Sequence, residues 1–366
     1  IVVVIPPPKR NARRANHRSY NPAMNRNLIV KRGNRSWFLG LGVSVGVAVW
    51  LSGALTGCLS GGQDKPVLDT ESDGSTVVED LADPIDLSMP DLQAPPPRCT
   101  GRAVMTAGTT TKKIMSGGKE RTYLLHIPTA YDPSKPTSLV FAFHGLSDKA
   151  PDFLKGIDLE READKRNLIA IAPQGLGILA GWNAGNCCGE PQLFKIDDVG
   201  FVRDMIDLAK RELCIDDKRI YAMGFSNGGM FTHRLACELS TVFSAVGPVS
   251  GTLMFPTCKP DRPVSIFHLH GNADPVVGYE GGGSGTFPKV TDVIAEWARR
   301  DACTGMPQQT YKMGSVTCNT SQTCAEGSDV TLCTIDQGKH TWPGSDGNKD
   351  ISATTALLDF FARHSR

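Results

Sequence analysis

The sequence has almost no net charge. Its 39 lysines and arginines stand against 38 aspartates and glutamates, which leaves a formal net charge of +1 at pH 7 over 366 residues. A chain this balanced gives no support for a nucleic-acid-binding surface, so we expect no nucleic-acid partner. The charge is unevenly distributed, because the first segment is basic and the next is acidic.

A complete set of metal ligands is also lacking. His268 and His270 would share one face of a strand, which is how a metal site can begin. No third ligand is evident in the sequence, so we expect no metal and no cofactor. A metal site at these two histidines remains the alternative.

An initiating methionine is absent from position 1, where the chain has Ile1. The sequence is therefore either a fragment or includes a translated upstream stretch, and we expect Met24 to be the natural start. Residues 1–23 resemble no ordered element.

An export signal follows Met24. Three basic residues precede an apolar region over residues 37–55, and Leu55-Thr56-Gly57-Cys58 then resembles the lipobox of bacterial lipoproteins. We expect residues 1–57 to be an upstream tail plus signal peptide, and Cys58 to carry lipid. An uncleaved membrane anchor is the alternative, because the apolar region is about as long as a membrane span.

The next segment, residues 58–98, is rich in Asp, Glu, Ser, Gly and Pro and has few aromatic residues. Such a composition buries too little apolar surface to offset the entropy of ordering, so we expect a disordered linker. Lipid at Cys58 would tether an exported domain to the bacterial cell envelope, unless the protein is released.

Residues 99–366 have the pattern of one α/β domain. Apolar runs with the length and composition of buried strands recur between helical patterns, which favours a mostly parallel sheet flanked by helices. We expect strands at residues 122–127, 138–143, 168–172, 243–250, 264–271 and 330–335, and helices at residues 159–166 and 353–364.

The motif Gly224-x-Ser226-x-Gly228 lies between an expected strand and an expected helix. This is the context of a nucleophile elbow, in which a tight turn lifts the serine oxygen above the sheet. Asp274 follows a late strand and His340 follows the last one. The order Ser226, Asp274, His340 is that of the α/β-hydrolase triad, so we predict this fold and these three catalytic residues.

Further site residues follow from the same fold. The backbone N–H groups of Leu146 and Asn227 occupy the positions of an oxyanion hole. Trp182 lies in a loop at the carboxyl end of the sheet, where it could wall a substrate site or pack the loop. Trp342 is the second expected substrate-binding residue. We expect His144 to brace its loop rather than act as the base.

The pair Asp197-Asp198 begins another expected helix, which runs to Leu213. Asp198 is well placed to cap it, and this role explains the residue without catalysis. Adjacent carboxylates cannot flank a glycosidic bond, so a glycosidase site here is improbable.

The chain has eleven cysteines, ten of which follow Cys58. An even number in an exported domain fits up to five disulfides, although sequence does not determine their connectivity. Two pairings, Cys318 with Cys324 and Cys303 with Cys333, would tie a hairpin to the last strand. We expect Cys187 and Cys188 to take different partners, because a bridge between neighbours is strained. Zinc is the alternative for the late cluster.

A family resemblance accompanies these residues. From Cys99 onward the chain resembles carbohydrate esterase family 1, the group of feruloyl esterases and poly(3-hydroxybutyrate) depolymerase-like enzymes. The matching segments are Phe143-His144-Gly145, Ala172-Pro173-Gln174-Gly175, Gly181-Trp182-Asn183, Cys187-Cys188-Gly189, Asp197-Asp198-Val199-Gly200-Phe201, Gly224-Phe225-Ser226-Asn227-Gly228-Gly229, His270-Gly271-Asn272-Ala273-Asp274-Pro275-Val276 and His340-Thr341-Trp342-Pro343-Gly344. One departure is Lys339, where these proteins usually have glycine.

The resemblance implies a serine esterase without cofactor that acts as a monomer on esters of plant polysaccharide, feruloyl esters first. Polyhydroxyalkanoate and acetylated xylan are alternative substrates. A non-catalytic binding lipoprotein on a retained hydrolase scaffold is the alternative from another class. A peptidase is disfavoured, because no gating domain precedes the catalytic one.

Overall fold

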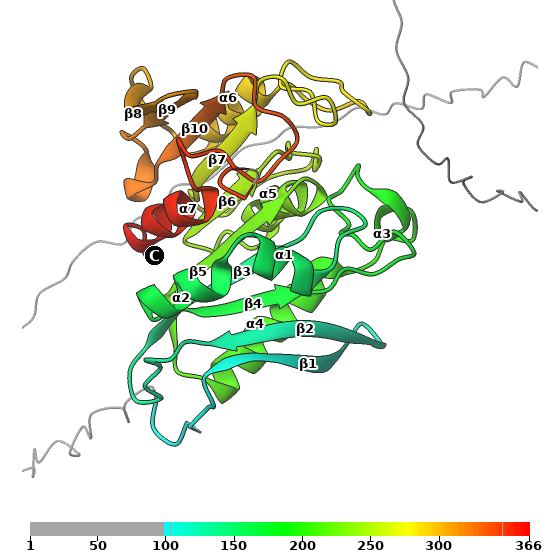
Figure 1. Cartoon of the computed structure of the whole chain (residues 1–366), viewed down its shortest axis with the longest axis vertical. Coiled ribbons are helices and arrows are strands. Elements are labelled where there is room, and N and C mark those ends of the chain that lie inside the picture. Colours follow the sequence, from blue (N-terminus) through cyan, green and yellow to red (C-terminus); the bar gives the residue numbers. More distant parts are fainter. Residues whose placement is uncertain (1–98, 103, 346) are drawn as a thin grey trace, which may run out of the picture. The chain divides into compact units, whose positions relative to one another are not determined.

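A ten-stranded sheet runs through the part of the chain that the structure, a computed structural model, describes: residues 99–102, 104–345 and 347–366 (Figure 1). The strands are β1 (Gly108–Ser116), β2 (Lys119–Ile127), β3 (Thr137–Phe143), β4 (Ile169–Pro173), β5 (Ile215–Phe225), β6 (Ala245–Val249), β7 (Ser265–Gly271), β8 (Gln308–Met313), β9 (Val316–Ser321) and β10 (Val330–Ile335).

The strand order is β1-β2-β4-β3-β5-β6-β7-β10-β9-β8. From β4 to β10 the neighbouring strands are parallel, whereas β1 and β2 at one edge and β8 and β9 at the other are antiparallel. The expected α/β class with a mostly parallel sheet is confirmed. Strands β4, β6 and β7 are buried along their whole length, which is why they read as continuous apolar runs.

Helices cover both faces of the sheet. They are α1 (Ala150–Gly156), α2 (Leu159–Arg166), α3 (Gly189–Leu193), α4 (Asp198–Glu212), α5 (Asn227–Glu238), α6 (Val290–Arg300), the short 3₁₀ helix η1 (Ala325–Gly327) and α7 (Ala353–Ala362). Helices α1, α2 and α7 pack on one face, and α4, α5 and α6 pack on the other (Figure 1). No helix in the described segments is both long and apolar enough to cross a membrane.

The strands expected from sequence are present, with bounds that differ by a few residues, and the two expected helices at 159–166 and 353–364 are α2 and α7. The edge strands β1 and β8 were not anticipated. Strand β8 is exposed along its whole length, and such a strand leaves no alternating apolar pattern to detect. The expected signal, Cys58 and the linker lie outside the described residues.

Parallel strands place their following loops at one edge of the sheet. The loops after β3, β5, β7 and β10 therefore bring Leu146, Ser226, Asp274 and His340 to the same edge. The long loop after β4, which contains Trp182, begins there as well.

The helix cap at α4 differs from expectation. The carboxylate of Asp197 caps the helix, since its Oδ1 accepts a hydrogen bond of 2.8 Å from Gly200 N–H. Asp198 is buried instead and pairs at 2.8 Å with the buried Arg121. Its other oxygen accepts a hydrogen bond of 2.8 Å from Asn183 N–H. Asp198 thus joins β2, α4 and the loop beside the site.

The two adjacent aspartates should therefore differ in their effect on stability. Asp198→Ala leaves Arg121 charged and buried without its partner, and we expect it to lower the free energy of unfolding by about 3–5 kcal/mol. Asp197→Ala removes only a cap and should cost about 1 kcal/mol. Urea unfolding of both variants measures the difference, and equal losses would contradict the assignment.

Five disulfides join the ten cysteines of the described part. They are Cys99–Cys214, Cys187–Cys188, Cys237–Cys258, Cys303–Cys324 and Cys318–Cys333. The pairings expected for the late cluster are wrong. Cys318 and Cys333 lie opposite each other on the antiparallel strands β9 and β10, a register that sequence spacing does not reveal. In this arrangement the late cysteines bind one another rather than zinc.

The expectation that Cys187 and Cys188 take different partners is also wrong. Their two sulfurs bond to each other, and the peptide bond between the two residues is cis.

The disulfide pattern predicts the thiol content of the denatured protein. Before reduction, the full chain should show at most one thiol, that of Cys58. Reduction should then release ten more. Thiol titration in denaturant makes this measurement, and several free thiols before reduction would contradict the five bridges.

Candidate active site

Ser226 sits at a sharp turn between β5 and α5. Its backbone has φ 54° and ψ −119°, a conformation that residues with a side chain seldom adopt. The turn is anchored to the neighbouring strand β6, because Ser226 N–H donates to the Val249 carbonyl at 2.9 Å. Crowding explains the glycine at 228, since a Cβ there would collide with the carbonyl oxygen of Phe143. Small neighbours thus let the serine occupy this position.

The structure brings together the three residues expected to form the triad. His340 Nε2 lies 2.9 Å from Ser226 Oγ, and His340 Nδ1 lies 2.8 Å from Asp274 Oδ2. A carboxylate oxygen can only accept, so Nδ1 carries the proton and Nε2 is free to accept one from the serine. This arrangement can activate a hydroxyl for nucleophilic attack.

Asp274 is held as a carboxylate. Burial by itself would raise its pKa, but hydrogen bonds from His270, His340 and the Val277 N–H outweigh that effect and keep the pKa well below its usual range. Its Oδ1 accepts from the backbone N–H groups of Val276 and Val277 at 2.8 and 3.0 Å. The acid therefore presents a fixed Oδ2 to His340.

The expected oxyanion donors flank the serine. Asn227 is the first residue of α5, where a backbone N–H has no carbonyl one turn earlier to bond. The loop after β3 comes close to the serine, because a Cβ at Gly145 would lie 3.6 Å from the Cβ of Ser226. Leu146 follows in that loop, and within the described residues its backbone N–H donates to no protein acceptor. Both residues thus have a backbone N–H left over for a ligand, and their role as oxyanion donors stays a prediction.

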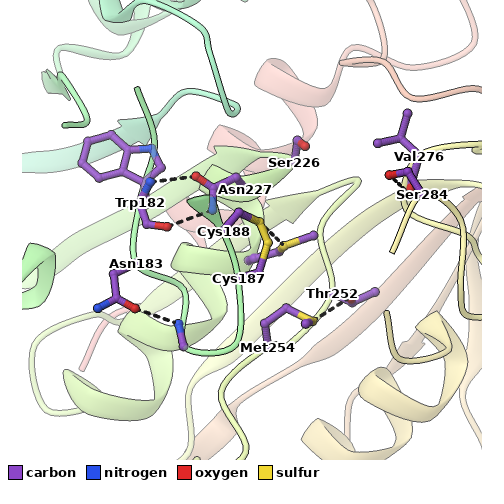
Figure 2. Close-up of a disulfide and its surroundings, with 12 residues drawn as sticks. Trp182, Asn183, Cys187, Cys188, Ser226, Asn227, Thr252, Met254, Val276 and Ser284 are labelled. Atoms are coloured by element: carbon purple, nitrogen blue, oxygen red, sulfur yellow. Dashed lines mark hydrogen bonds between the residues drawn. A yellow bond between two sulfur atoms is a disulfide. The ribbon is translucent and has the colours of Figure 1, made fainter. Parts of the chain in front are cut away.

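The side chain of Asn227 has a role that the sequence did not suggest. Its Oδ1 accepts from Trp182 N–H at 2.7 Å and its Nδ2 donates to the Trp182 carbonyl at 3.0 Å (Figure 2). This pair of hydrogen bonds fastens the loop after β4 to the start of α5. Only the fold brings residues 182 and 227 together, so local sequence carries no signal for it.

The two tryptophans expected to bind substrate do not line the site. Trp182 is fully buried, stacks on Phe231, and donates from Nε1 to the His144 carbonyl at 2.9 Å. Trp342 is also buried, and its Nε1 donates to Thr354 Oγ1 at 3.0 Å. Neither ring is therefore open to substrate in this structure, and Trp182 has the loop-packing role that was the alternative. Each indole N–H finds an internal partner, which allows the ring to be buried.

His144 braces its loop, as expected. Its Nδ1 donates to the Gly145 carbonyl at 2.7 Å, and its Nε2 accepts from Gly175 N–H at 2.9 Å. Burial lowers the pKa of His144, so the ring stays neutral in this double role.

The surface near Ser226 is apolar. Figure 2 shows Ser226 with the Cys187–Cys188 disulfide on one side and Val276 on the other. Val276 and Leu146, in the loops after β7 and β3, are each 37% exposed. A separate hollow, lined by Tyr311, Met313 and other residues of β8 and α7, contains none of the triad.

Among the residues that the structure describes, no group of three or more His, Cys, Asp or Glu could hold a metal ion. His268 and His270 hydrogen-bond to each other instead, with His268 Nε2 3.0 Å from His270 Nδ1.

The chain is similar to known esterases over much of the described part. The family described as Phospholipase/Carboxylesterase matches residues 128–296. Feruloyl esterase B of Piromyces equi is 32% identical over 234 residues, an alignment that covers 60% of this chain and 42% of that protein. The chain thus spans less than half of that relative. Probable feruloyl esterase C of Aspergillus terreus is 30% identical over 192 residues, which cover 50% of this chain and 67% of the relative.

A solved structure supports the same fold. Acetyl xylan esterase from Aspergillus awamori superposes with a TM-score of 0.53 at 13% identity, covering 69% of this chain and 99% of that one. Sheet order, nucleophile turn and relatives agree, and the chain belongs to the feruloyl esterase-like family of α/β-hydrolases.

Proposed function

We propose that this protein hydrolyses carboxylic esters through an acyl-enzyme formed on Ser226. The observation that carries the proposal is the continuous hydrogen-bonded series Ser226–His340–Asp274, with spacings of 2.9 and 2.8 Å. An intact series of this kind also argues against a purely binding role, since a binding protein needs no aligned proton acceptor.

The reaction follows from the geometry. His340 Nε2 takes the Ser226 proton as Oγ attacks the ester carbonyl, and the N–H groups of Leu146 and Asn227 receive the developing oxyanion. Asp274 stabilises the imidazolium, which then gives its proton to the departing alcohol. His340 then takes a proton from water as the water attacks the acyl-enzyme. The carboxylic acid product leaves, and Ser226 regains its proton from His340.

For the substrate, we propose feruloyl esters of plant polysaccharide. Two features support an aromatic acyl group: the feruloyl esterases among the relatives, and the partly exposed apolar side chains of Leu146 and Val276 in the loops that follow β3 and β7. An acetyl group would use little of that surface. Acetylated xylan and polyhydroxyalkanoate remain the alternatives that a substrate panel separates.

For the location, we propose an exported protein that acts outside the cytoplasm. Five disulfides in the described part support an oxidising compartment. Lipid attachment at Cys58 is part of the same proposal, and a monomer is the expected state. Both rest on the sequence.

The catalytic proposal predicts the effect of removing the nucleophile. Wild-type protein should hydrolyse methyl ferulate and, to a lesser extent, p-nitrophenyl acetate. Ser226→Ala should lower kcat by about a thousandfold or more, because without the nucleophile only the part of the rate enhancement that comes from the oxyanion donors and substrate binding remains. Acetylated xylan and poly(3-hydroxybutyrate) complete the panel and rank the substrates.

A fluorophosphonate probe supplies the control. It should label wild-type protein at Ser226 and leave the folded Ser226→Ala variant unlabelled. Native protein that neither labels nor hydrolyses any of these esters would support the binding-protein alternative instead.

The apolar surface can be tested through selectivity. Leu146→Ala and Val276→Ser keep both backbone N–H groups but remove apolar contact with an aromatic acyl group. We expect each to lower kcat/KM for methyl ferulate by about tenfold, in line with about 1–3 kcal/mol for a lost apolar contact, and to change kcat/KM for p-nitrophenyl acetate little.

Met115→Ser is the matched control, because Met115 is 63% exposed on the edge strand β1. It should leave both substrates unaffected. Equal losses on the two esters in the Leu146 and Val276 variants would show that this surface does not select the acyl group.

A further inference from the structure

Three buried histidines form a hydrogen-bonded chain behind the triad acid. Trp297 Nε1 donates to His233 Nδ1 at 3.0 Å, and His233 Nε2 lies 3.3 Å from His268 Nδ1. His268 Nε2 lies 3.0 Å from His270 Nδ1, and His270 Nε2 lies 2.8 Å from the Val277 carbonyl oxygen. This series of hydrogen-bonded side chains runs from α6 through α5 to two positions of β7. It ends in the loop that carries Asp274.

The direction in which the hydrogen bonds of this series are donated is determined at both of its ends. An indole N–H can only donate, and a carbonyl oxygen can only accept. His233 Nδ1 must therefore accept, which leaves its proton on Nε2. The same reasoning passes to His268 and then to His270. All three rings are thereby assigned the tautomer with the proton on Nε2.

The surroundings of the chain keep the first two rings neutral. The three histidine side chains are fully buried. Burial lowers the pKa of His233 to about 3, and lowers that of His268 well below its usual range. The positive charge of Arg300, which lies over the Trp297 ring, acts in the same direction on His233. A neutral ring is the form that can both donate and accept.

The last ring of the chain reaches the triad acid by two routes. His270 Nε2 donates to the carbonyl of Val277, and the N–H of Val277 donates to Asp274 Oδ1 at 3.0 Å. The same Nε2 lies 3.4 Å from Asp274 Oδ2, the oxygen that His340 contacts. His270 thus secures the turn that holds one carboxylate oxygen and lies beside the other.

We propose that His270 is a positioning residue for Asp274, and that the chain from Trp297 through His233 and His268 serves to present the Nε2 proton of His270 to that turn. Its kinetic meaning rests on the esterase function proposed above. The geometry itself does not depend on that function. Each Nδ1 lone pair accepts a hydrogen bond from the preceding member of the series. The three imidazoles therefore do not point toward a common centre, as ligands of a metal ion would.

Packing alone does not explain the arrangement. Apolar residues fill a core at lower cost than three imidazoles, because every buried polar atom must find a partner. Here each of the six ring nitrogens has a partner in one series that ends at the Val277 carbonyl, in the turn of the acid, and His233 has a further backbone hydrogen bond to Gly251. Because all hydrogen bonds of the series point the same way, the series keeps the proton of His270 on Nε2.

The tautomers are the first test, and they require no activity. The protein is labelled with ¹⁵N-histidine, and long-range ¹H–¹⁵N correlations distinguish a proton on Nε2 from one on Nδ1. Single substitutions assign the signals. We expect His233, His268 and His270 all to carry the proton on Nε2 at neutral pH. A proton on Nδ1 of any of the three would overturn the proposal.

Two isosteric substitutions give the second test. His270→Gln places an amide N–H near the former Nε2, whereas His270→Asn places it near Nδ1. We expect His270→Gln to keep kcat within about threefold of wild type. His270→Asn should lower kcat by about 10- to 100-fold with KM little changed, because the acid is displaced while substrate contacts remain. Equal kcat values in the two variants would overturn the positioning role.

A control and an activity-independent readout complete the design. His364 is also largely buried, near Ser265 and away from the triad, so His364→Asn should perturb the core but leave kcat unchanged. The ¹⁵N signals of His340 report on Asp274 directly. They should move in His270→Asn and stay in place in His270→Gln. Signals that move alike in both variants would refute the positioning role even in a protein without esterase activity.

Discussion

Ser226 has a backbone conformation that few residues other than glycine adopt, and the segments around it keep it there. Its N–H bonds to Val249 in the neighbouring strand, and its carbonyl accepts from Met230 one helical turn later. The turn points the hydroxyl at His340, whose Nε2 lies 2.9 Å from Ser226 Oγ. Strand β5 and helix α5 thus meet at an angle that only a tight turn allows, and the other site residues are arranged around it.

The acid is positioned differently from the nucleophile. Asp274 follows β7 in a short turn, and its carboxylate is buried among donors rather than held by backbone strain. In a low-dielectric environment a carboxylate stays ionised only when several hydrogen bonds favour the charged form. The turn, His340 and His270 together provide them. The surrounding core must therefore contain polar groups, and the fold accommodates them in one connected series.

The loop after β4 shows how a long irregular segment becomes part of a site. Asn227 bonds to both backbone groups of Trp182, and Asp198 bonds to the next residue, Asn183, while paired with Arg121. Buried polar anchors of this kind satisfy loop backbone groups that helices and strands would otherwise satisfy. The loop can then place the Cys187–Cys188 disulfide near Ser226 without regular secondary structure (Figure 2).

The sequence by itself determined the class of fold, the central strands and the turn at Ser226, because these depend on local composition: buried strands are apolar, and the turn requires small residues around the serine. The order of Ser226, Asp274 and His340 along the chain followed from the same local patterns. Tertiary structure alone decided which cysteines pair, which aspartate caps α4, that Trp182 and Trp342 are buried, and that His233 joins His268 and His270. Most of these depend on residues distant in the chain, such as Arg121 for Asp198 and Phe231 for Trp182, that come into contact only when sheet and helices pack. Spacing within one segment carries no information about such a partner.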